Sequence, residues 1–301
     1  MVDITHKNST LRKAIATALV KTSSTHTIAA VVERKVPKGD VFEFARAAGL
    51  LAIKKTSDVV PDCHPLPIEF AAITYEVENV SIIVKVEVHT IYKTGVEVEA
   101  MHGASVAALV MYDMLKPIDK GVTIEQVRLL EKKGGKSDIK GNQSPVRTAV
   151  VVCSDRVSSG VREDTAGKYI VSSLPKYGLE CNYYEVIPDD FNRIQEKAKA
   201  LVVQGFELVI FTGGTGLSAR DVTPDALEPL IDRNIPGIME SARNYGQLRT
   251  PYAMLSRGVG GFISNTLILT FPGSQKAVEE YLSALFPQIL HVLEVKAGDP
   301  H

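Results

Sequence analysis

The chain has 301 residues, 45% of them hydrophobic, which is enough for two domains that each bury a core. Its 34 Lys and Arg residues nearly balance its 35 Asp and Glu residues, so no overall basic field points to a nucleic-acid partner. An anion-binding site in this chain must therefore be local.

Cysteine content and hydropathy indicate the cell compartment. The three cysteines, Cys63, Cys153 and Cys181, include no CxxC pair, as expected in a reducing compartment without a disulfide framework. The N-terminal sequence MVDITHKNST lacks the apolar segment of a secretory signal. No apolar run reaches the ~18 residues that a membrane-spanning helix needs. We expect a cytoplasmic protein that binds neither a membrane nor nucleic acid.

The first half of the chain mixes helical and strand patterns. Asp40 is a candidate N-cap, and residues 81–92 alternate apolar and polar side chains. We expect a helix over residues 40–60, a hairpin of strands over 68–77 and 81–92, a long helix over 95–119 and a strand over 121–133. Helices on an antiparallel sheet give an α+β domain, for which a ferredoxin-like arrangement is the expected form.

A polar, Gly-rich segment at residues 132–146, KKGGKSDIKGNQSPV, is typical of a linker and divides the chain into domains of residues 1–140 and 145–301. Beyond it strands and helices alternate. Strands are expected over 147–155, 179–190, 206–214 and 265–273, and helices over 164–178, 191–205 and from 274 onward. This order predicts a doubly wound α/β domain with a mainly parallel sheet.

Four loops follow strands of that sheet, at the edge where such folds bind ligands. They read SDRVSSG, IPDD, TGGTG and FPGS, and all are rich in Gly, Ser, Thr or Asp. One such loop alone is more simply a turn. Four at the same edge favour a binding site.

The loop TGGTG is not a P-loop, because no Gly-Lys-Ser/Thr follows it. Its backbone N–H groups can still form an anion nest over Thr212, Gly213, Gly214, Thr215 and Gly216. Asp189 and Asp221 then fit the role of Mg²⁺ ligands, because a cation that bridges carboxylate and phosphate replaces the charge of the absent lysine. The simpler alternative for Asp221 is a helix N-cap, although Pro224 at the first helical position would make Thr223 the cap.

Residues 145–295 carry a resemblance to a known family. The motifs SDRVSSGVREDTAG, IPDD, TGGTGLSARDVTPDAL and LSRGVGG…TLILTFPGS are together similar to those of molybdopterin adenylyltransferase, within the molybdopterin-binding fold family. The resemblance implies transfer of AMP from ATP to the terminal phosphate of molybdopterin, with Mg²⁺ and release of pyrophosphate. It assigns functional roles to Asp189, Asp221, the glycine loop and Ser256, and it implies trimers.

One departure from that family leaves an alternative open. The family often has Arg and Gly where this chain has Ile263 and Ser264. If the Arg helps to hold phosphate, its absence favours the alternative that the second domain is a non-catalytic pterin-binding or scaffolding module.

Polar residues of the first half have both structural and functional interpretations. Cys63 and His64 lie between prolines in VVPDCHPLPI, where a rigid loop is the simpler interpretation and a metal site lacks further ligands nearby. Glu97 and Glu99 stand near the start of the long helix, where acids suit the helix dipole.

Asp113 and Lys116 lie three residues apart on one helical face, as either a surface ion pair or a proton-shuttling pair. Other basic residues are spread over several elements, where they either converge on a polyphosphate or coat a surface. Among them are Lys54, Arg128 and Lys132.

A second resemblance covers residues 1–138. The blocks KGDVFEFARAAGLLAIKKTSDVVPDCHPLPI, TGVEVEAMHGASVAAL, MYDMLKPIDK and VRLLEKKGGKS are similar to those of cyclic pyranopterin monophosphate synthase. The family turns a cyclic dihydro-GTP derivative into cyclic pyranopterin monophosphate and pyrophosphate. The resemblance implies a catalytic Asp113 with Lys116, a second functional lysine at Lys132, and a hexameric assembly that contains dimers. It places substrate contacts at Asp62, Cys63, His64, Val98, Glu99, Ala100 and Met101.

Asp62 departs from this pattern, since an apolar residue is usual there. Its charge would repel a triphosphate unless the side chain points away or pairs with a lysine.

Both resemblances point to molybdenum cofactor biosynthesis. We therefore expect a bifunctional homo-oligomer, a trimer or hexamer, that takes pterin and nucleotide substrates and has other proteins of the pathway as possible partners. A general nucleotide-binding protein, without preference for pterins, is the remaining alternative.

Overall fold

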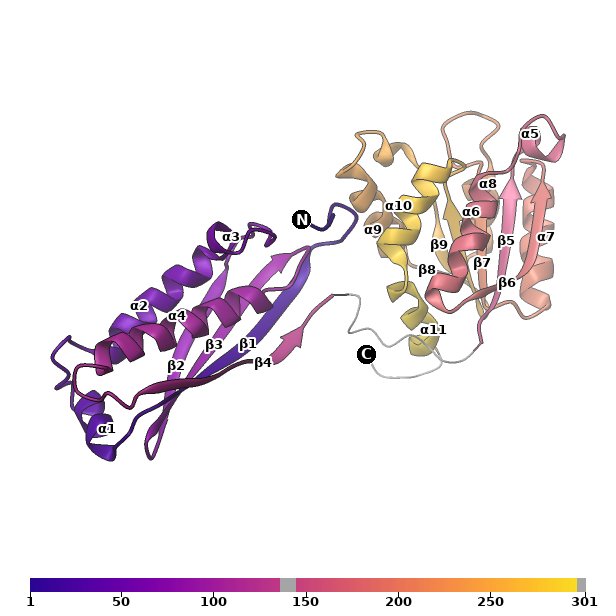
Figure 1. Ribbon diagram of the computed structural model, residues 1–301. Helices are drawn as coiled ribbons and strands as arrows, with labels where there is room; N and C mark the ends of the chain where they lie inside the picture. The colour runs from indigo at the N-terminus through magenta and orange to yellow at the C-terminus, as the bar shows by residue number, and fades with distance from the viewer. Residues whose placement is uncertain (136–144, 297–301) are drawn as a thin grey trace. The chain divides into compact units, whose positions relative to one another are not determined.

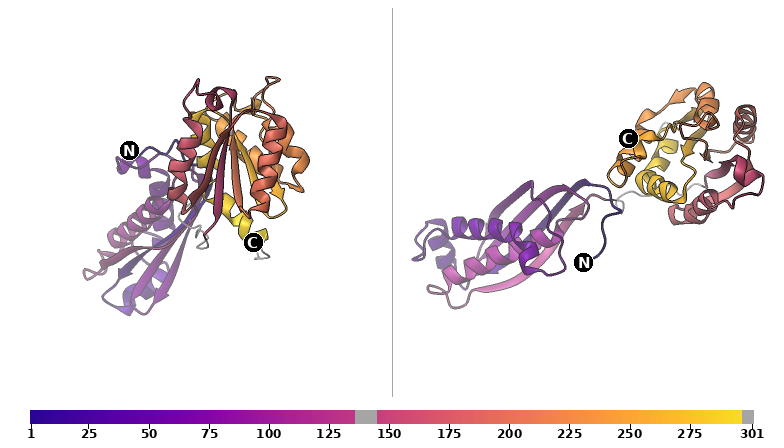
Figure 2. Two further views of the ribbon diagram at one scale, coloured as in Figure 1. Left: turned by 90° about the vertical axis from the view of Figure 1, so that its right-hand side faces the viewer. Right: turned by 90° about the horizontal axis from the view of Figure 1, so that it is seen from above.

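The computed structural model describes residues 1–135 and 145–296. The chain divides into two compact units, Met1–Asp138 and Ile139–His301, which are drawn in Figures 1 and 2 and are described here one at a time. Most of the predicted linker lies outside the described residues, and its first two residues, Lys132 and Lys133, end a strand. None of the helices in the described parts is long and apolar enough to cross a bilayer.

A four-stranded antiparallel sheet, in the order β2-β3-β1-β4, forms the first unit. Two of its helices, α2 and α4, lie side by side over one face of the sheet (Figure 1), which is an α+β arrangement. The elements are β1 (Thr10–Lys21), α1 (Thr25–Val32), α2 (Val41–Lys54), α3 (Thr56–Val59), β2 (Phe70–Glu78), β3 (Ser81–Tyr92), α4 (Glu97–Leu115) and β4 (Thr123–Lys133).

Strand β1 lies at the centre of this sheet, and the sequence analysis missed it. Its buried face carries Ala14, Ala16, Ala18 and Val20. Alanine has little preference for strands, so the segment lacks the β-branched pattern that made β3 easy to predict. Its pairing with β3 on one side and β4 on the other makes it a strand.

Helix α2 begins where the sequence predicts. The Asp40 carboxylate accepts the backbone N–H groups of Phe42 and Glu43 at 3.1 and 3.2 Å. The single helix expected over residues 40–60 is wrong in detail, because Lys55 separates α2 from the short α3.

Small residues let α2 and α4 approach closely. A Cβ added at Gly49 would come within 3.1 Å of the Gly103 carbonyl oxygen, and one at Gly103 within 2.6 Å of Ile53 Cγ1. This contact fixes α4, the helix that carries more of the predicted site residues of this unit than any other element.

A six-stranded sheet, in the order β6-β5-β7-β10-β9-β8, forms the second unit. The predicted mainly parallel sheet is confirmed by β5 (Arg147–Cys153), β6 (Glu180–Ile187), β7 (Leu208–Thr212) and β10 (Thr266–Phe271). The sequence analysis missed the antiparallel edge, formed by β8 (Arg233–Asn234) and β9 (Gly260–Ile263), and the helix α9 (Pro236–Gln247).

Helices cover both faces of this sheet (Figure 2). On one face pack α6 (Ala166–Ser173), α9 and α10 (Gln275–Leu285), and on the other α7 (Phe191–Val203) and α8 (Thr223–Leu227). Alternate strand residues enter the two cores: Val150 and Ile210 on one face, Val151 and Phe211 on the other. The four parallel strands therefore all end at the same edge.

Candidate functional site

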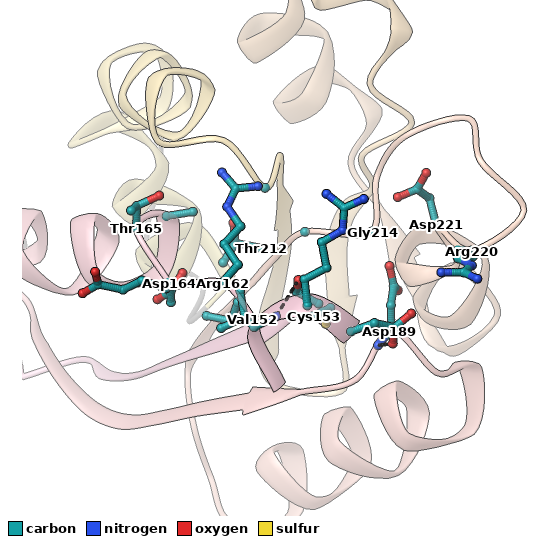
Figure 3. A pocket seen from close by; sticks show the side chains of 18 of the residues that line it. Val152, Cys153, Arg162, Asp164, Thr165, Asp189, Thr212, Gly214, Arg220 and Asp221 are labelled. Carbon is teal, nitrogen blue, oxygen red and sulfur yellow. Dashed lines mark hydrogen bonds between the residues drawn. The ribbon is translucent and has the colours of Figure 1, made fainter. Parts of the chain in front are cut away.

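A cavity of about 300 Å³ lies at the carboxyl edge of the second unit's sheet, and we call it the glycine-loop cavity. All four predicted loops line it, through residues that include Ser154, Asp189, Gly213 and Gly273. Figure 3 shows Asp189, Asp221 and Arg220 at one side of the cavity, and Arg162, Asp164 and Thr165 toward the other.

The glycine loop packs tightly against the strand ends. Gly213 and Gly214 have φ of 102° and 61°, in the left-handed region. A Cβ at Gly213 would lie 2.2 Å from the Cys153 carbonyl oxygen, and one at Gly214 would lie 2.5 Å from Asp189 Oδ1. Glycine is therefore required where the backbone meets the Asp189 carboxylate.

Not all of the predicted loop reaches the cavity. Thr212, Gly213 and Gly214 line it, whereas Thr215 and Gly216 do not. Thr215 is buried and Gly216 turns its carbonyl oxygen to an arginine. These two residues shape the loop instead of facing the ligand space.

The two predicted aspartates act on each other at one side of the cavity. Burial raises the pKa of the half-buried Asp189 to about 6, and the charge of Asp221 adds to this effect. Asp221 Oδ2 accepts the backbone N–H of Ser218 at 2.9 Å. Two carboxylates that repel each other beside a space for a ligand suit a divalent cation.

No group of three or more His, Cys, Asp or Glu side chains in the described parts of the chain could hold a metal ion. A Mg²⁺ ion at Asp189 and Asp221, as the sequence predicts, would therefore need oxygen ligands from a bound substrate as well, which is a common way for proteins to hold Mg²⁺.

Neither predicted cap of α8 is correct. Val222 is the N-cap residue, without a side-chain hydrogen bond to the helix. Thr223 is already helical, and its hydroxyl donates to Asp189 Oδ1 at 3.3 Å. Asp221 is therefore not needed as a cap.

Three arginines that the sequence analysis did not select also line the cavity: Arg156, Arg162 and Arg220. The search for a P-loop lysine overlooked them, although they stand inside the quoted motifs. Asp164 lines the cavity too, but it accepts the Gly167 N–H at 2.9 Å and the Tyr184 hydroxyl at 2.6 Å. Asp164 thus anchors the start of α6.

Ser256 lies outside the glycine-loop cavity. It lines a different cavity beside α10, where it receives a hydrogen bond from the Tyr281 hydroxyl at 3.1 Å. The single predicted site in this unit is therefore divided between two cavities.

Arg257, which follows Ser256, ties the glycine loop together. Its Nε donates to the Gly216 carbonyl oxygen at 2.8 Å, and its Nη1 donates to both carboxylate oxygens of Asp225 at 2.9 Å. Its Nη2 donates to the backbone carbonyl of Asp221. The sequence shows a charged residue in the motif LSRG, but the neighbouring residues do not indicate which groups it contacts.

In the first unit, Asp113 lies near the C-terminal end of α4 between two lysines. Lys116 Nζ lies 2.8 Å from Asp113 Oδ1, and Lys38 Nζ lies 2.6 Å from Asp113 Oδ2. Hydrogen bonds from Lys116 and Lys38 hold the pKa of Asp113 at about 2, so it is charged at neutral pH. The sequence analysis proposed the first contact and missed Lys38, which stands in the quoted block KGDV.

A second cluster lies at the opposite end of α4. Cys63 Sγ donates to Glu99 Oε1 at 3.3 Å, and Lys132 Nζ lies 2.6 Å from Glu97 Oε1. Burial and the neighbouring Glu99 raise the pKa of Cys63 to about 11. Burial also raises the pKa of Glu99, whose Oε2 has no hydrogen-bond partner among the described residues. These groups are not arranged to make a thiolate nucleophile.

The loop before this cluster forms a hollow of about 300 Å³ lined by Asp62, Cys63, His64, Glu97 and Val98. His64 Nε2 lies 2.8 Å from the Val2 carbonyl oxygen. Asp62 pairs with the N-terminal ammonium at 2.7 Å, which lowers its pKa. The cation that offsets Asp62 is thus the chain terminus and not a lysine.

The remaining predicted residues take other places. Ala100 is buried in the core and Met101 packs partly against it. Lys54 ends α2. Arg128 pairs in register with Thr17 and lines a shallow hollow on the sheet face away from α2 and α4.

Within one copy of the chain, the two clusters of the first unit do not meet. Glu99 and Asp113 stand 14 residues apart on α4, which is about 21 Å at about 1.5 Å per residue. One bound substrate cannot bridge that distance.

Comparison with known proteins assigns the chain to a family. The model of the MoaC family matches residues 1–135, and that of a probable molybdopterin binding domain matches residues 149–291. The whole chain is 37% identical to the molybdenum cofactor biosynthesis bifunctional protein of Chlorobaculum tepidum and covers 96% of it. The chain belongs to the bifunctional proteins of molybdenum cofactor biosynthesis.

Two other relatives agree with this family. The whole chain is 35% identical to the bifunctional protein of Synechococcus elongatus, covering 98% of it. Over 141 residues, 46% of the chain, it is 49% identical to the cyclic pyranopterin monophosphate synthase of Pelobacter propionicus, covering 88% of that protein. The solved MoaB structure from Thermus thermophilus covers 52% of this chain and 98% of its own, at 38% identity and a TM-score of 0.49. Membership in this family excludes the general nucleotide-binding alternative.

Proposed function

We propose that the first unit is a cyclic pyranopterin monophosphate synthase that acts on a cyclic dihydro-GTP derivative and releases pyrophosphate. The name of the Pelobacter propionicus relative supports this activity. The observation that carries the proposal is Asp113 held between Lys116 and Lys38. The lysines offer positive charge to the phosphates, and the carboxylate and ammonium groups can pass a proton during ring formation.

The test of this assignment is turnover by two variants. Asp113→Asn and Lys116→Ala are each expected to lower the rate by ~10²–10⁴-fold, the usual contribution of a general acid or base. Both should melt near the wild-type temperature, because the ion pairs are half-exposed. Near-normal turnover of both variants at saturating substrate would show that the pairing is only a surface feature.

We also propose that this unit is a homo-oligomer whose site is shared between copies. The support is the separation of the Cys63–Glu99 cluster from the Asp113 cluster along α4. A second copy that packs α4 in the opposite direction would bring the start of one helix beside the end of the other. The residues of both clusters would then face one substrate.

Subunit complementation tests the shared site. His64→Ala and Asp113→Asn are each expected to be inactive alone, since each damages one cluster. Co-expressed with different affinity tags and purified as mixed oligomers, they should recover part of the activity, because some sites then hold no altered residue. Mixed oligomers that form but stay inactive would mean that each copy has a complete site of its own.

For the second unit we propose transfer of AMP from ATP to molybdopterin with Mg²⁺. The glycine loop offers backbone N–H groups, and Arg156, Arg162 and Arg220 offer positive charge around the same cavity. Asp189 and Asp221 would hold the cation together with phosphate oxygens. The cation would supply charge neutralisation for the attacked phosphate.

The alternative is a non-catalytic pterin-binding module, and Ile263 is the observation behind it. That side chain is 8% exposed in the core and brings no charge to the cavity. The three arginines of the glycine-loop cavity favour the enzyme, because they provide the positive charge that the missing family Arg would add.

An assay with ATP, Mg²⁺ and molybdopterin separates the two. Wild-type protein should release pyrophosphate, and Asp221→Ala should shift the Mg²⁺ dependence to higher concentration while pterin binding persists. Glu228→Ala, which removes an exposed acid outside the cavity, is the control. Pterin binding without any AMP transfer would establish the binding module instead, and an unchanged Mg²⁺ dependence would remove Asp221 from the site.

The topology of the first unit supports a finer fold assignment, which we also propose. Its elements run strand, helices, strand, strand, helix, strand, in an antiparallel sheet of order β2-β3-β1-β4. This is the order that ferredoxin-like domains follow.

A further inference from the structure

Two loops of the glycine-loop cavity lie next to each other because of the strand order. Strands β5 and β6 are parallel neighbours, and Cys153 at the end of β5 pairs in register with Ile187 at the end of β6. Asp155 and Asp189 each stand two residues beyond these partners, and both line the cavity. Parallel strands that end in register release their loops at the same edge of the sheet, so the two acids lie on adjacent loops.

Asp155 contacts the backbone of the neighbouring loop. Its Oδ1 accepts the backbone N–H of Asp189 at 3.1 Å. A second contact joins the same two loops, since the backbone N–H of Ser154 donates to the Ile187 carbonyl oxygen at 3.0 Å. Ser154 also caps the short helix α5 (Asp155–Ser158), whose first residue is Asp155. The carboxylate of Asp155 therefore joins the loop after β6 to the end of β5.

The side chain of Asp189 has a narrow place to occupy. Thr223 donates its hydroxyl to Asp189 Oδ1 at 3.3 Å, and a Cβ added at Gly214 would lie 2.6 Å from Asp189 Oδ2. A small shift of the Asp189 backbone would move the carboxylate against Gly214 or away from Thr223. The position of this carboxylate thus depends on where its backbone is held, and a displacement of about 1 Å at a reacting site can cost ~10²-fold in rate.

Direct binding of a cation is the alternative role for Asp155. Within the parts of the chain that the structure describes, no three His, Cys, Asp or Glu side chains could hold a metal ion together, so Asp155 does not complete such a group with Asp189 and Asp221. One oxygen of Asp155 already accepts the Asp189 N–H. The contacts of Asp155 therefore favour a role that acts through Asp189.

We propose that Asp155 is a positioning residue for the reaction of the second unit: its carboxylate holds the backbone of Asp189 and so keeps the Asp189 carboxylate on the same side of the cavity as Asp221 (Figure 3). This inference rests on the proposed transfer of AMP, in which Asp189 and Asp221 hold the cation. It gives the loop SDRVSSG a role in that reaction, which the sequence analysis left unassigned.

The experiment compares Asp155→Ala with Asp155→Asn in the full chain. Alanine removes the acceptor, whereas asparagine keeps an oxygen that can accept the Asp189 N–H. We expect Asp155→Ala to lower kcat for AMP transfer about 10–100-fold and Asp155→Asn to retain most of the wild-type rate. Asp232→Ala is the matched control, because Asp232 is an exposed acid outside the cavity that also accepts a backbone N–H, that of Ser264 at 2.6 Å.

Hydrogen exchange supplies a second measurement that needs neither substrate nor cation. In Asp155→Ala the exchange over residues 187–190 should accelerate about tenfold, because the Asp189 N–H loses its acceptor. In Asp155→Asn and Asp232→Ala it should stay near the wild-type rate. All three variants should melt near the wild-type temperature, since both aspartates are exposed.

Three results would overturn the proposal. Exchange over residues 187–190 that does not change in Asp155→Ala would show that the contact does not hold the loop. Faster exchange with normal AMP transfer would make the contact purely structural. Normal exchange but lost activity in Asp155→Asn would mean that the charge of Asp155 acts on the cation directly. A wild-type protein without AMP transfer would instead refute the proposed function, and the exchange rates would still decide whether Asp155 holds Asp189.

Discussion

The ammonium group of Lys38 lies 2.6 Å from Asp113 Oδ2, although 75 residues separate the two in the chain. Lys116 holds the other oxygen at 2.8 Å, so one exposed carboxylate bridges two cations. Because both lysines contact the same carboxylate, we expect Lys38 to share the proposed roles of Lys116 in phosphate binding and proton transfer.

We predict that Lys38→Ala lowers synthase turnover by about 10²-fold or more, since the site loses a cation for phosphate and a proton-transfer partner. Steady-state kinetics with the cyclic dihydro-GTP derivative measure this. Lys35→Ala is the control, because Lys35 is 72% exposed and, among the residues that the structure describes, forms an ion pair only with Glu33. If the two variants were equally active, Lys38 would form only a surface ion pair and would take no part in the reaction.

The environment of Cys63 predicts that its thiol reacts slowly with alkylating reagents at neutral pH. Burial and the hydrogen bond to Glu99 raise its pKa to about 11, so the reactive thiolate is scarce at pH 7. Alkylation by iodoacetamide, followed for Cys63 by peptide mass spectrometry, should accelerate about tenfold per pH unit up to a pH of about 11.

Removing the neighbouring acid should reverse part of this effect. Glu99→Gln lowers the pKa of Cys63 and speeds its alkylation at pH 8, because the carboxylate no longer opposes the thiolate charge. A wild-type rate that levels off near pH 8.5, the value of a free cysteine, would contradict the predicted environment.

We predict that Arg257 stabilises the conformation of the glycine loop in the second unit. Arg257→Lys cannot donate to Gly216, Asp221 and Asp225 together, because an ammonium lacks the planar fork of a guanidinium. We expect faster hydrogen exchange over residues 213–225 and about tenfold lower AMP transfer, the effect of about 1.4 kcal/mol.

Asp225→Asn is a milder change to compare with Arg257→Lys. It weakens the ion pair between Arg257 and Asp225 but keeps the hydrogen bonds of Arg257 to the backbone of Gly216 and Asp221. Hydrogen exchange and AMP transfer should therefore change less than in Arg257→Lys. Unchanged exchange over residues 213–225 in Arg257→Lys would show that the loop keeps its conformation without the guanidinium.

The predicted boundary between the domains has a direct test. Residues 1–140 and 145–301, expressed apart, should each fold and keep their own proposed activity, because each unit has its own core. Separate melting curves and both rates, compared with the intact chain, measure this. A half that is insoluble, or inactive until the other is added, would mean that the units form one cooperative domain.

Local sequence patterns were enough to predict much of the fold. Alternation in residues 81–92 predicted β3, whose Ile82, Val84, Val86 and Val88 are all 0% exposed. The hydrophobic run before TGGTG predicted β7. These patterns work because burial alternates with period 2 in a strand, and neighbouring residues alone reveal it. The alanine-rich β1 gave no such signal, and the short edge strands β8 and β9 gave little.

The sequence by itself determined which loops meet at the carboxyl edge of the second unit, because parallel strands end on one side of a sheet and Asp189, Gly213 and Asp221 stand in those loops. Only the tertiary structure decided the partners: Lys38 for Asp113, the N-terminal ammonium for Asp62, and the loop carbonyls for Arg257. It also separated the two clusters of the first unit along α4. The physical reason is the distance along the chain between the residues that interact. Periodicity and capping are encoded within a few residues, whereas a charge finds its partner only after the packing of helices and strands brings distant segments together.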